Sequence, residues 1–216
     1  MGGLLPRRRQ QAQGAPVGGA AAHLPLEALH RFQVVVEAGR FGRQHGRQAL
    51  ALGPYGRGFV ALAAARAASG GADRDTVAAE AESTVSRVHA FLVVQRLENL
   101  RRSGRIGAAA SWLGTALALK PLLRIDDGKL VLAQRVRTTS KATVAMVEQV
   151  LAVVGERRAA LAVHHVDNPA GAAEVAATLA GALPGCGPVI VTDLGPVLGV
   201  HLGPGAVGVV LALEPD

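Results

Sequence analysis

The sequence predicts an α/β fold in which residues 121–216 form a mostly antiparallel sheet with two helices on one face. Asp127-Gly128 lies between two strand-like runs and is typical of a two-residue hairpin turn. Asn168 followed by Pro169 is a signal for the start of a helix. In chain order, residues 121–213 predict two hairpin strands (122–125 and 129–137), a helix capped by Thr139 or Ser140, a strand (159–166), the helix after Asn168, and two further buried strands (188–192 and 207–213).

The preceding segment, residues 56–120, has a mainly helical pattern. Gly70-Gly71 is expected to stop the first helix, and Asp73 or Asp75 to cap the second. The predicted elements are a helix over 59–69, a second helix with Val77, Ala81, Val85 and Val88 on one face, a short buried strand over 89–94, a short helix over 96–103 that ends at Gly104, and a helix over 106–119.

Residues 1–55 are basic and rich in Gly, Ala and Arg, and they show no sustained apolar period beyond a helix-compatible stretch at 26–38. Residues 1–58 contain eight Arg and two Glu, a balance of +6, whereas the remaining residues have a balance of +1. A basic tail that binds RNA or anionic lipid is one interpretation. We favour a disordered or non-native leader, because the basic residues are not interleaved with aromatic residues for base stacking, and we expect no specific nucleic-acid partner.

The composition also restricts the class of protein. Cys186 is the only cysteine, which excludes an internal disulfide and a cysteine-based metal site and fits a cytoplasmic protein. The N-terminus lacks the apolar core of a signal peptide. The longest apolar run, residues 106–119, is shorter than the ~20 residues of a membrane span, so we expect at most transient membrane contact.

A Gly- and Pro-rich stretch, residues 195–208, lies between the last two predicted strands and contains His201. A turn-rich loop of this kind could place an imidazole and several bare N–H groups around one small acidic head group. From spacing alone, a structural turn with a partly buried histidine is the favoured interpretation.

Other histidines give weaker signals. His164 and His165 are adjacent in a predicted strand and so point to opposite faces; we expect one exposed and one packed residue and no metal site. Asp193 and His201 could form an acid–base pair, but no nucleophile motif accompanies them, so a hydrolase is a poor candidate.

Several segments, in order and spacing from about Gly56 to Leu213, resemble the DegV family of fatty-acid-binding proteins. They are Leu97-Glu98-Asn99-Leu100-Arg101-Arg102-Ser103-Gly104-Arg105-Ile106, Leu113-Gly114, Lys120-Pro121-Leu122, Asp127-Gly128, Arg135-Val136-Arg137-Thr138 and Gly195-Pro196-Val197-Leu198-Gly199-Val200-His201-Leu202-Gly203-Pro204-Gly205. Each segment is weak alone, whereas together they are specific. By this resemblance, residues 56–120 are a helical remnant of the family's N-terminal α/β domain and residues 121–216 its C-terminal domain.

The resemblance implies a lipid-binding protein that holds a long-chain fatty acid in a tunnel between two domains and presents its carboxylate to a partner fatty acid kinase. It implies no cofactor and no catalysis by the chain itself. His201 and the N–H groups around Gly203 would face the head group, with Arg105 as a further candidate for the carboxylate. Arg137 and Thr138 would dock the kinase; a solvated strand end is the simpler interpretation of these two residues.

The sequence also departs from the family, because the hydroxyl-rich segments of its N-terminal half do not occur before Gly56. Three hypotheses follow. A fatty-acid carrier is the main one, and a non-functional truncated product is the alternative. An enzyme of phosphotransferase or hydrolase type is less favoured, because the chain has no GxxxxGK[ST] loop and no carboxylate cluster for Mg²⁺.

Overall fold

The computed structural model describes residues 53–104, 120–126 and 129–215, with side chains from Gly56 onward. Three expectations lie outside these residues: the leader, the helix predicted over 106–119, and the conformation of the turn at 127–128. Arg105 also lies outside them.

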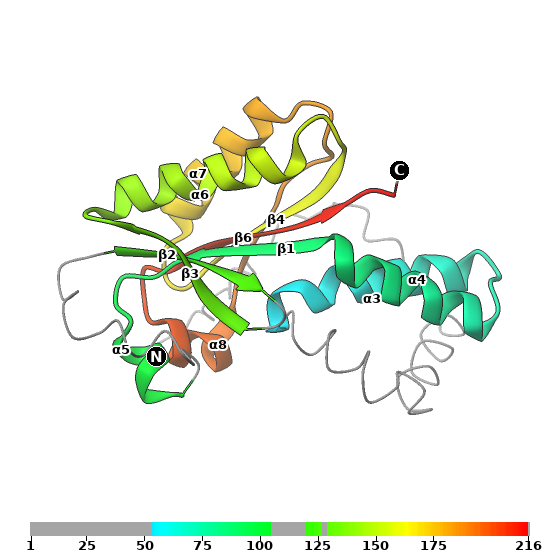
Figure 1. The fold of residues 1–216 in the computed structure, drawn as a ribbon, viewed down its shortest axis with the longest axis horizontal. Coiled ribbons are helices and arrows are strands. Elements are labelled where there is room, and N and C mark those ends of the chain that lie inside the picture. Colours follow the sequence, from blue (N-terminus) through cyan, green and yellow to red (C-terminus); the bar gives the residue numbers. More distant parts are fainter. Residues whose placement is uncertain (1–52, 105–119, 127–128, 216) are drawn as a thin grey trace, which may run out of the picture.

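The described strands form one six-stranded sheet in the order β3-β2-β1-β6-β4-β5 (Figure 1). Each neighbouring pair is antiparallel except β4 and β5, which confirms a mostly antiparallel sheet. The hairpin predicted around Asp127-Gly128 joins β2 and β3, since Asp126 pairs with Lys129. The strands are β1 (Val88–Val93), β2 (Lys120–Asp126), β3 (Lys129–Val136), β4 (Ala159–His165), β5 (Ile190–Asp193) and β6 (Val207–Leu213).

The strand β1 lies in the centre of this sheet, between β2 and β6. It pairs with β6 over all six of its residues, from Val88 opposite Ala212 to Val93 opposite Val207. Five of its six residues are buried, as expected for a strand covered on both faces. A strand from the segment 56–120 and the strands after residue 120 therefore build a single sheet.

Two helices, α6 (Thr139–Val154) and α7 (Pro169–Ala182), cover one face of the sheet (Figure 1). Asn168 caps α7 as predicted, its side chain accepting a hydrogen bond of 3.1 Å from the N–H of Gly171. The cap of α6 is Thr138 and not Thr139 or Ser140, because the Thr138 hydroxyl accepts from the N–H of Lys141 at 3.2 Å. The core beneath these helices is formed by one set of alternating strand residues, among them Phe91, Val93, Leu161, Val163, Val207, Val209, Leu211 and Leu213.

Two helix pairs cover the other face at opposite ends of the sheet (Figure 1). The helices α3 (Gly53–Ser69) and α4 (Arg74–Arg87) pack on Val88, Ala90, Val210 and Ala212. The helices α5 (Glu98–Arg102) and α8 (Gly195–Leu202) contribute Leu100 and Leu202 to a separate core with Leu92, Val94, Leu123 and Ala206. This face therefore carries two small apolar cores in place of one continuous core.

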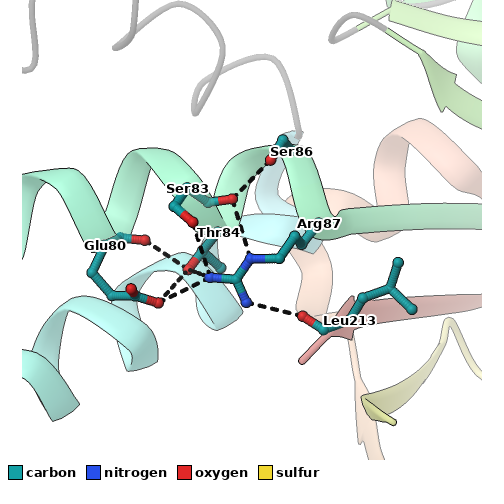
Figure 2. A network of polar contacts seen from close by, with 6 residues as sticks. All are labelled: Glu80, Ser83, Thr84, Ser86, Arg87 and Leu213. Carbon is teal, nitrogen blue, oxygen red and sulfur yellow. Dashed lines mark hydrogen bonds and ion pairs between the residues drawn. The ribbon is translucent and has the colours of Figure 1, made fainter. Parts of the chain in front are cut away.

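The end of α4 is fixed to the end of β6 by Arg87 (Figure 2). Its Nη1 donates to the carbonyl of Leu213 at 3.0 Å, and its Nη2 donates to Glu80 Oε1 at 2.9 Å and to the buried Thr84 hydroxyl at 3.1 Å. One guanidinium thus joins the helix that precedes β1 to the strand beside β1.

One strand differs from its prediction. The run over 188–192 was expected to be a buried strand, but all four residues of β5 are exposed. Among the described strands, β5 lies at the edge of the sheet and pairs only with β4. Its apolar residues Ile190 and Val191 are 53% and 43% exposed, as this edge position leaves them with few neighbours.

Candidate functional site: an apolar cavity beside the His201 helix

An apolar cavity lies on the sheet face that carries the two separate cores. It is small and partly open to solvent, and no charged side chain lines it. Its lining comes from β1, β6 and the β2–β3 hairpin and consists of Ala90, Phe91, Leu92, Ile125, Leu130, Gly208 and Val210. Ala90 and Val210 belong to the core under α3 and α4, whereas Leu92 belongs to the core beside α5 and α8. The cavity therefore marks the place where the two cores meet.

Gly208 helps to keep this cavity open. It lies opposite Leu92 within β6, and a Cβ at Gly208 would lie 3.0 Å from the carbonyl oxygen of Phe91 and 3.1 Å from Leu92 Cδ1. A side chain here would press on a strand backbone that cannot move far. A small residue is thus required at the floor of the cavity.

The stretch after β5 is a helix, which corrects the expected turn-rich loop. Residues Gly195–Leu202 form α8, and Pro196 lies in its first turn. Asp193 Oδ1 accepts a hydrogen bond of 2.6 Å from the N–H of Gly195, which fixes the start of the helix. Gly203 ends it with a φ of +77°, a conformation that favours glycine.

His201 lies in the last turn of α8 and is half-buried. Its Nδ1 is buried and has no hydrogen-bond partner among the described residues. The same helix presents Val197 and Val200, which are 75% and 68% exposed. An unpartnered imidazole nitrogen close to exposed apolar side chains is a suitable arrangement for a ligand with one polar end.

The sequence suggested that the backbone N–H groups of the turn after His201 would be free for a ligand, but they donate hydrogen bonds within the chain. The N–H of Gly203 donates to the carbonyl of Gly199 at 2.8 Å, and the N–H of Gly205 donates to the carbonyl of Val166 at 2.8 Å. A Cβ at Gly203 would overlap the side-chain amide nitrogen of Asn99. Both N–H groups are therefore engaged within the chain, whereas the imidazole Nδ1 of His201, like that of His164, has no partner among the described residues.

Arg137 and Thr138 lie between β3 and α6, where both are exposed. The Thr138 hydroxyl is engaged as the cap of α6. Both residues come directly before Thr139, whose hydroxyl donates to Gln95 Oε1 at 3.1 Å.

The sequence reasoning missed Gln95. It follows β1 closely, and its Nε2 donates to the carbonyl of Gly205 at 3.1 Å. The turn after His201 and the turn that carries Arg137 are thereby connected through one side chain. No sequence signal distinguishes this glutamine from a surface residue, because its partners are 44 and 110 residues away.

The other histidines also differ from expectation. His164 is half-buried and His165 is buried, so neither is exposed. Asp193 Oδ2 lies 3.4 Å from Nδ1 of His165, which makes His165 its neighbour in place of the imagined partner His201. Burial lowers the pKa of His164 below its ordinary value near 6.5, and the neighbouring His165 lowers the same pKa further. Among the described residues, no group of three or more His, Cys, Asp or Glu could hold a metal ion.

Comparison with known proteins identifies the family. A family model described as "Uncharacterised protein, DegV family" matches residues 52–214. The chain belongs to the DegV family. The DegV domain-containing protein Rv2417c of Mycobacterium tuberculosis is 64% identical over 154 residues, which cover 71% of this chain and 55% of that relative. The DegV domain-containing protein SCO2569 of Streptomyces coelicolor is 36% identical over 210 residues, which cover 94% of this chain and 73% of that relative, so this alignment reaches into residues 1–55.

Solved DegV structures share the fold. The fatty acid binding DegV family protein SAG1342 from Streptococcus agalactiae superposes with a TM-score of 0.69 at 26% identity, covering 74% of this chain and 56% of that one. A DegV family protein from Thermus thermophilus, described by its fatty acid binding, gives a TM-score of 0.69 at 31% identity and covers 74% of this chain and 57% of that one. The chain thus spans little more than half the length of these two proteins and of Rv2417c. No described helix is long and apolar enough to cross a membrane.

Proposed function

We propose that this chain binds a long-chain fatty acid and that the cavity between the two small cores takes part of the acyl chain. The observation that carries the proposal is the purely apolar lining of that cavity, between Ala90 and Leu92 of β1 and Gly208 and Val210 of β6. Burial of an acyl chain contributes about 0.8 kcal/mol per CH₂ group. The space inside the cavity is small, so it suits a short segment of an acyl chain and not a whole ligand.

The carboxylate is proposed to bind at the end of α8, with His201 as its main partner. The buried Nδ1 of His201 lacks a partner in the described structure, and a carboxylate contact would satisfy the imidazole. Gly203 would hold the turn that ends α8 beside the head group, and Arg105 would supply a cation to the carboxylate. These three residues are our proposed ligand-binding set.

A non-catalytic role completes the proposal: the chain presents its fatty acid to a partner fatty acid kinase. The exposed Arg137 and the adjacent Thr138 are the proposed docking residues. A guanidinium at an exposed strand end can pair with a carboxylate on a partner without a large desolvation cost. A hydrolase or phosphotransferase reaction has no comparable support among the described side chains, because Asp193 lies against His165.

The test is direct measurement of binding by the purified 216-residue chain. Native mass spectrometry after incubation with oleate should show a one-to-one complex, and organic extraction should recover the acid. The variant Ala90→Leu fills the cavity and should weaken binding about tenfold or more, since it excludes several CH₂ groups. The matched control is Ala160→Leu, because Ala160 of β4 faces the same side of the sheet outside the cavity lining.

The head-group assignment needs a second comparison. His201→Ala should weaken binding of oleate more than binding of oleyl alcohol, because only the acid carries a carboxylate for the imidazole. Equal weakening of both lipids would remove His201 from the head-group role. Absence of any complex with the wild-type chain, or Ala90→Leu binding as tightly as Ala160→Leu, would contradict the proposed function itself.

A further inference from the structure

A single amide side chain connects the two turns to which the proposed function assigns roles. Gln95 is half-buried beyond the end of β1. Its Nε2 donates to the carbonyl of Gly205 at 3.1 Å, and its Oε1 accepts from the Thr139 hydroxyl at 3.1 Å. Lys120 adds a donor from the start of β2, with Nζ 3.0 Å from the Gln95 carbonyl and 3.4 Å from Oε1. The opposite ends of one planar amide thus bind two different segments of the chain.

The donor end of Gln95 meets a turn that has little freedom to adapt. Gly205 has a φ of +82°, and a Cβ there would lie 2.8 Å from Gln95 Cγ. Its carbonyl also accepts from Asn168 Nδ2 at 3.3 Å, and its N–H donates to Val166 at 2.8 Å. The turn from Gly203 to Ala206 follows directly on α8, which carries His201 in its last turn, so a shift of α8 would move this turn as well.

The acceptor end of Gln95 meets the first residue of α6. Thr139 follows Arg137 and Thr138 in sequence, and the Thr138 carbonyl accepts from the N–H of Ala142 at 3.0 Å. The orientation of this first turn therefore determines where the exposed Arg137 side chain emerges. Because Oε1 and Nε2 belong to one rigid plane, movement of Gly205 turns the group that holds Thr139.

We propose that Gln95 is a positioning residue that sets the turn after His201 and the start of α6 together, so that a head group bound at His201 alters the docking surface at Arg137 and Thr138. The inference rests on the proposed function for the roles of these two surfaces. The mechanical link itself can be tested without ligand. Coupling of this kind is reciprocal, so disturbing either turn must disturb the other.

Two variants separate the ends of the amide. Gln95→Glu keeps acceptor oxygens for Thr139 and Lys120 but loses the donor to Gly205, whereas Thr139→Val loses only the hydroxyl. Thr143→Val is the matched control, because its hydroxyl donates to the Thr139 carbonyl at 3.1 Å within α6 and not to Gln95. The readout is amide hydrogen exchange at Gly203 and Gly205, whose N–H groups are hydrogen-bonded in the turn.

In the ligand-free chain, Gln95→Glu should speed exchange at Gly205 about three- to tenfold. Thr139→Val should speed exchange at Gly205 as well, although Thr139 makes no contact with it, and Thr143→Val should not. Unchanged exchange at Gly205 in Thr139→Val, or an equal change in Thr143→Val, would overturn the inference. A merely structural role of Thr139 would affect α6 alone.

The second part of the experiment repeats these exchange measurements with oleate. In the wild-type chain, oleate should slow exchange at Gly205 and also at Lys141 and Ala142 in the first turn of α6. In Thr139→Val, the effect on α6 should disappear while the effect on Gly205 persists. Failure of the wild-type chain to respond to oleate at all would count against the proposed function, and the ligand-free comparison would still decide the role of Gln95.

Discussion

The two ends of β1 are held by polar side chains of different kinds. Arg87, directly before the strand, ties the end of α4 to the end of β6 through the carbonyl of Leu213 (Figure 2). Gln95, just beyond the strand, ties the start of β6 to the start of α6. The first end uses a cation with a carboxylate partner, Glu80, at 2.9 Å, whereas the second end uses a neutral amide, to whose oxygen the Lys120 ammonium donates at 3.4 Å.

This difference assigns an anchoring role to Arg87 and a positioning role to Gln95. Hydrogen bonds from an ionised donor are roughly twice as strong as those between neutral groups, so the Arg87 end should contribute more to the free energy of unfolding. Neutral hydrogen bonds contribute about 1 kcal/mol each. The Gln95 end also carries the turn after His201 and the proposed docking residues, so the weaker connection lies where the head group is proposed to bind.

The largest effect is expected at the anchoring end. Arg87→Met keeps much of the aliphatic stem but leaves the Leu213 carbonyl and the buried Thr84 hydroxyl without their donor, and it should lower the free energy of unfolding by about 2–3 kcal/mol. Urea denaturation measures this loss. Glu80→Gln is the control, since it keeps an acceptor for Arg87, and should cost about 1 kcal/mol or less. Equal losses of unfolding free energy in the two variants would show that the Arg87–Glu80 ion pair, and not the hydrogen bond from Arg87 to the Leu213 carbonyl, stabilises the fold.

At the positioning end, a backbone change should have a smaller effect. Gly203→Ala places a Cβ at a φ of +77° and against the amide nitrogen of Asn99, and should cost about 1–2 kcal/mol. The double variant Asn99→Ala with Gly203→Ala removes the overlap and should retain only the backbone part of the loss. Urea denaturation of both variants and of Asn99→Ala gives the coupling energy. Strict additivity would show that Asn99 simply moves aside.

The elements with local signals could be predicted from the sequence. The start of α7 depends on residues that are close in the chain, because Asn168 accepts from the N–H of Gly171 and Pro169 lies in the first turn. The hairpin at Asp127-Gly128 likewise depends on adjacent residues. The buried strand over 207–213 was also predicted, because an uninterrupted apolar run suits a strand covered on both faces. His201 was recognised as a candidate through its family context.

What the sequence could not show depends on distant partners. The glycines of residues 195–208 favour a turn, yet Pro196 and the hydrogen bond from Gly195 to Asp193 start a helix, and Leu202 buries its side chain against Leu100 and Leu92 to stabilise it. The bonds of Gln95 span 44 and 110 residues, so no local pattern contains them. The exposure of β5 likewise follows from its position at the edge of the sheet, which is a property of topology and not of the run itself.

The smallest expected effect is on the pH dependence of stability, and it concerns one histidine near the Arg87 end of β1 and one near the Gln95 end. His89 of β1 lies two residues after Arg87, and His164 of β4 lies two residues before Val166, which bonds to Gly205. Burial lowers the pKa of both side chains below the usual value near 6.5; Arg157 lowers the pKa of His89 further, and His165 lowers that of His164 further. The folded state therefore favours neutral imidazoles, whereas the unfolded chain takes up protons once the pH falls below about 6.5.

The resulting stability is fully present above pH ~6.5 and is lost as the pH falls through the lowered pKa values of the folded state. His89→Gln and His164→Gln should each reduce the loss of stability between pH 7.5 and pH 5, measured by urea denaturation at both values. The two residues occupy opposite faces of the sheet, and only His164, opposite Gly208, lies on the face of the cavity. Oleate should therefore change the pH dependence that His164 contributes and leave that of His89 as it was; an equal change in both would show that the ligand stabilises the whole sheet without approaching the Gln95 end.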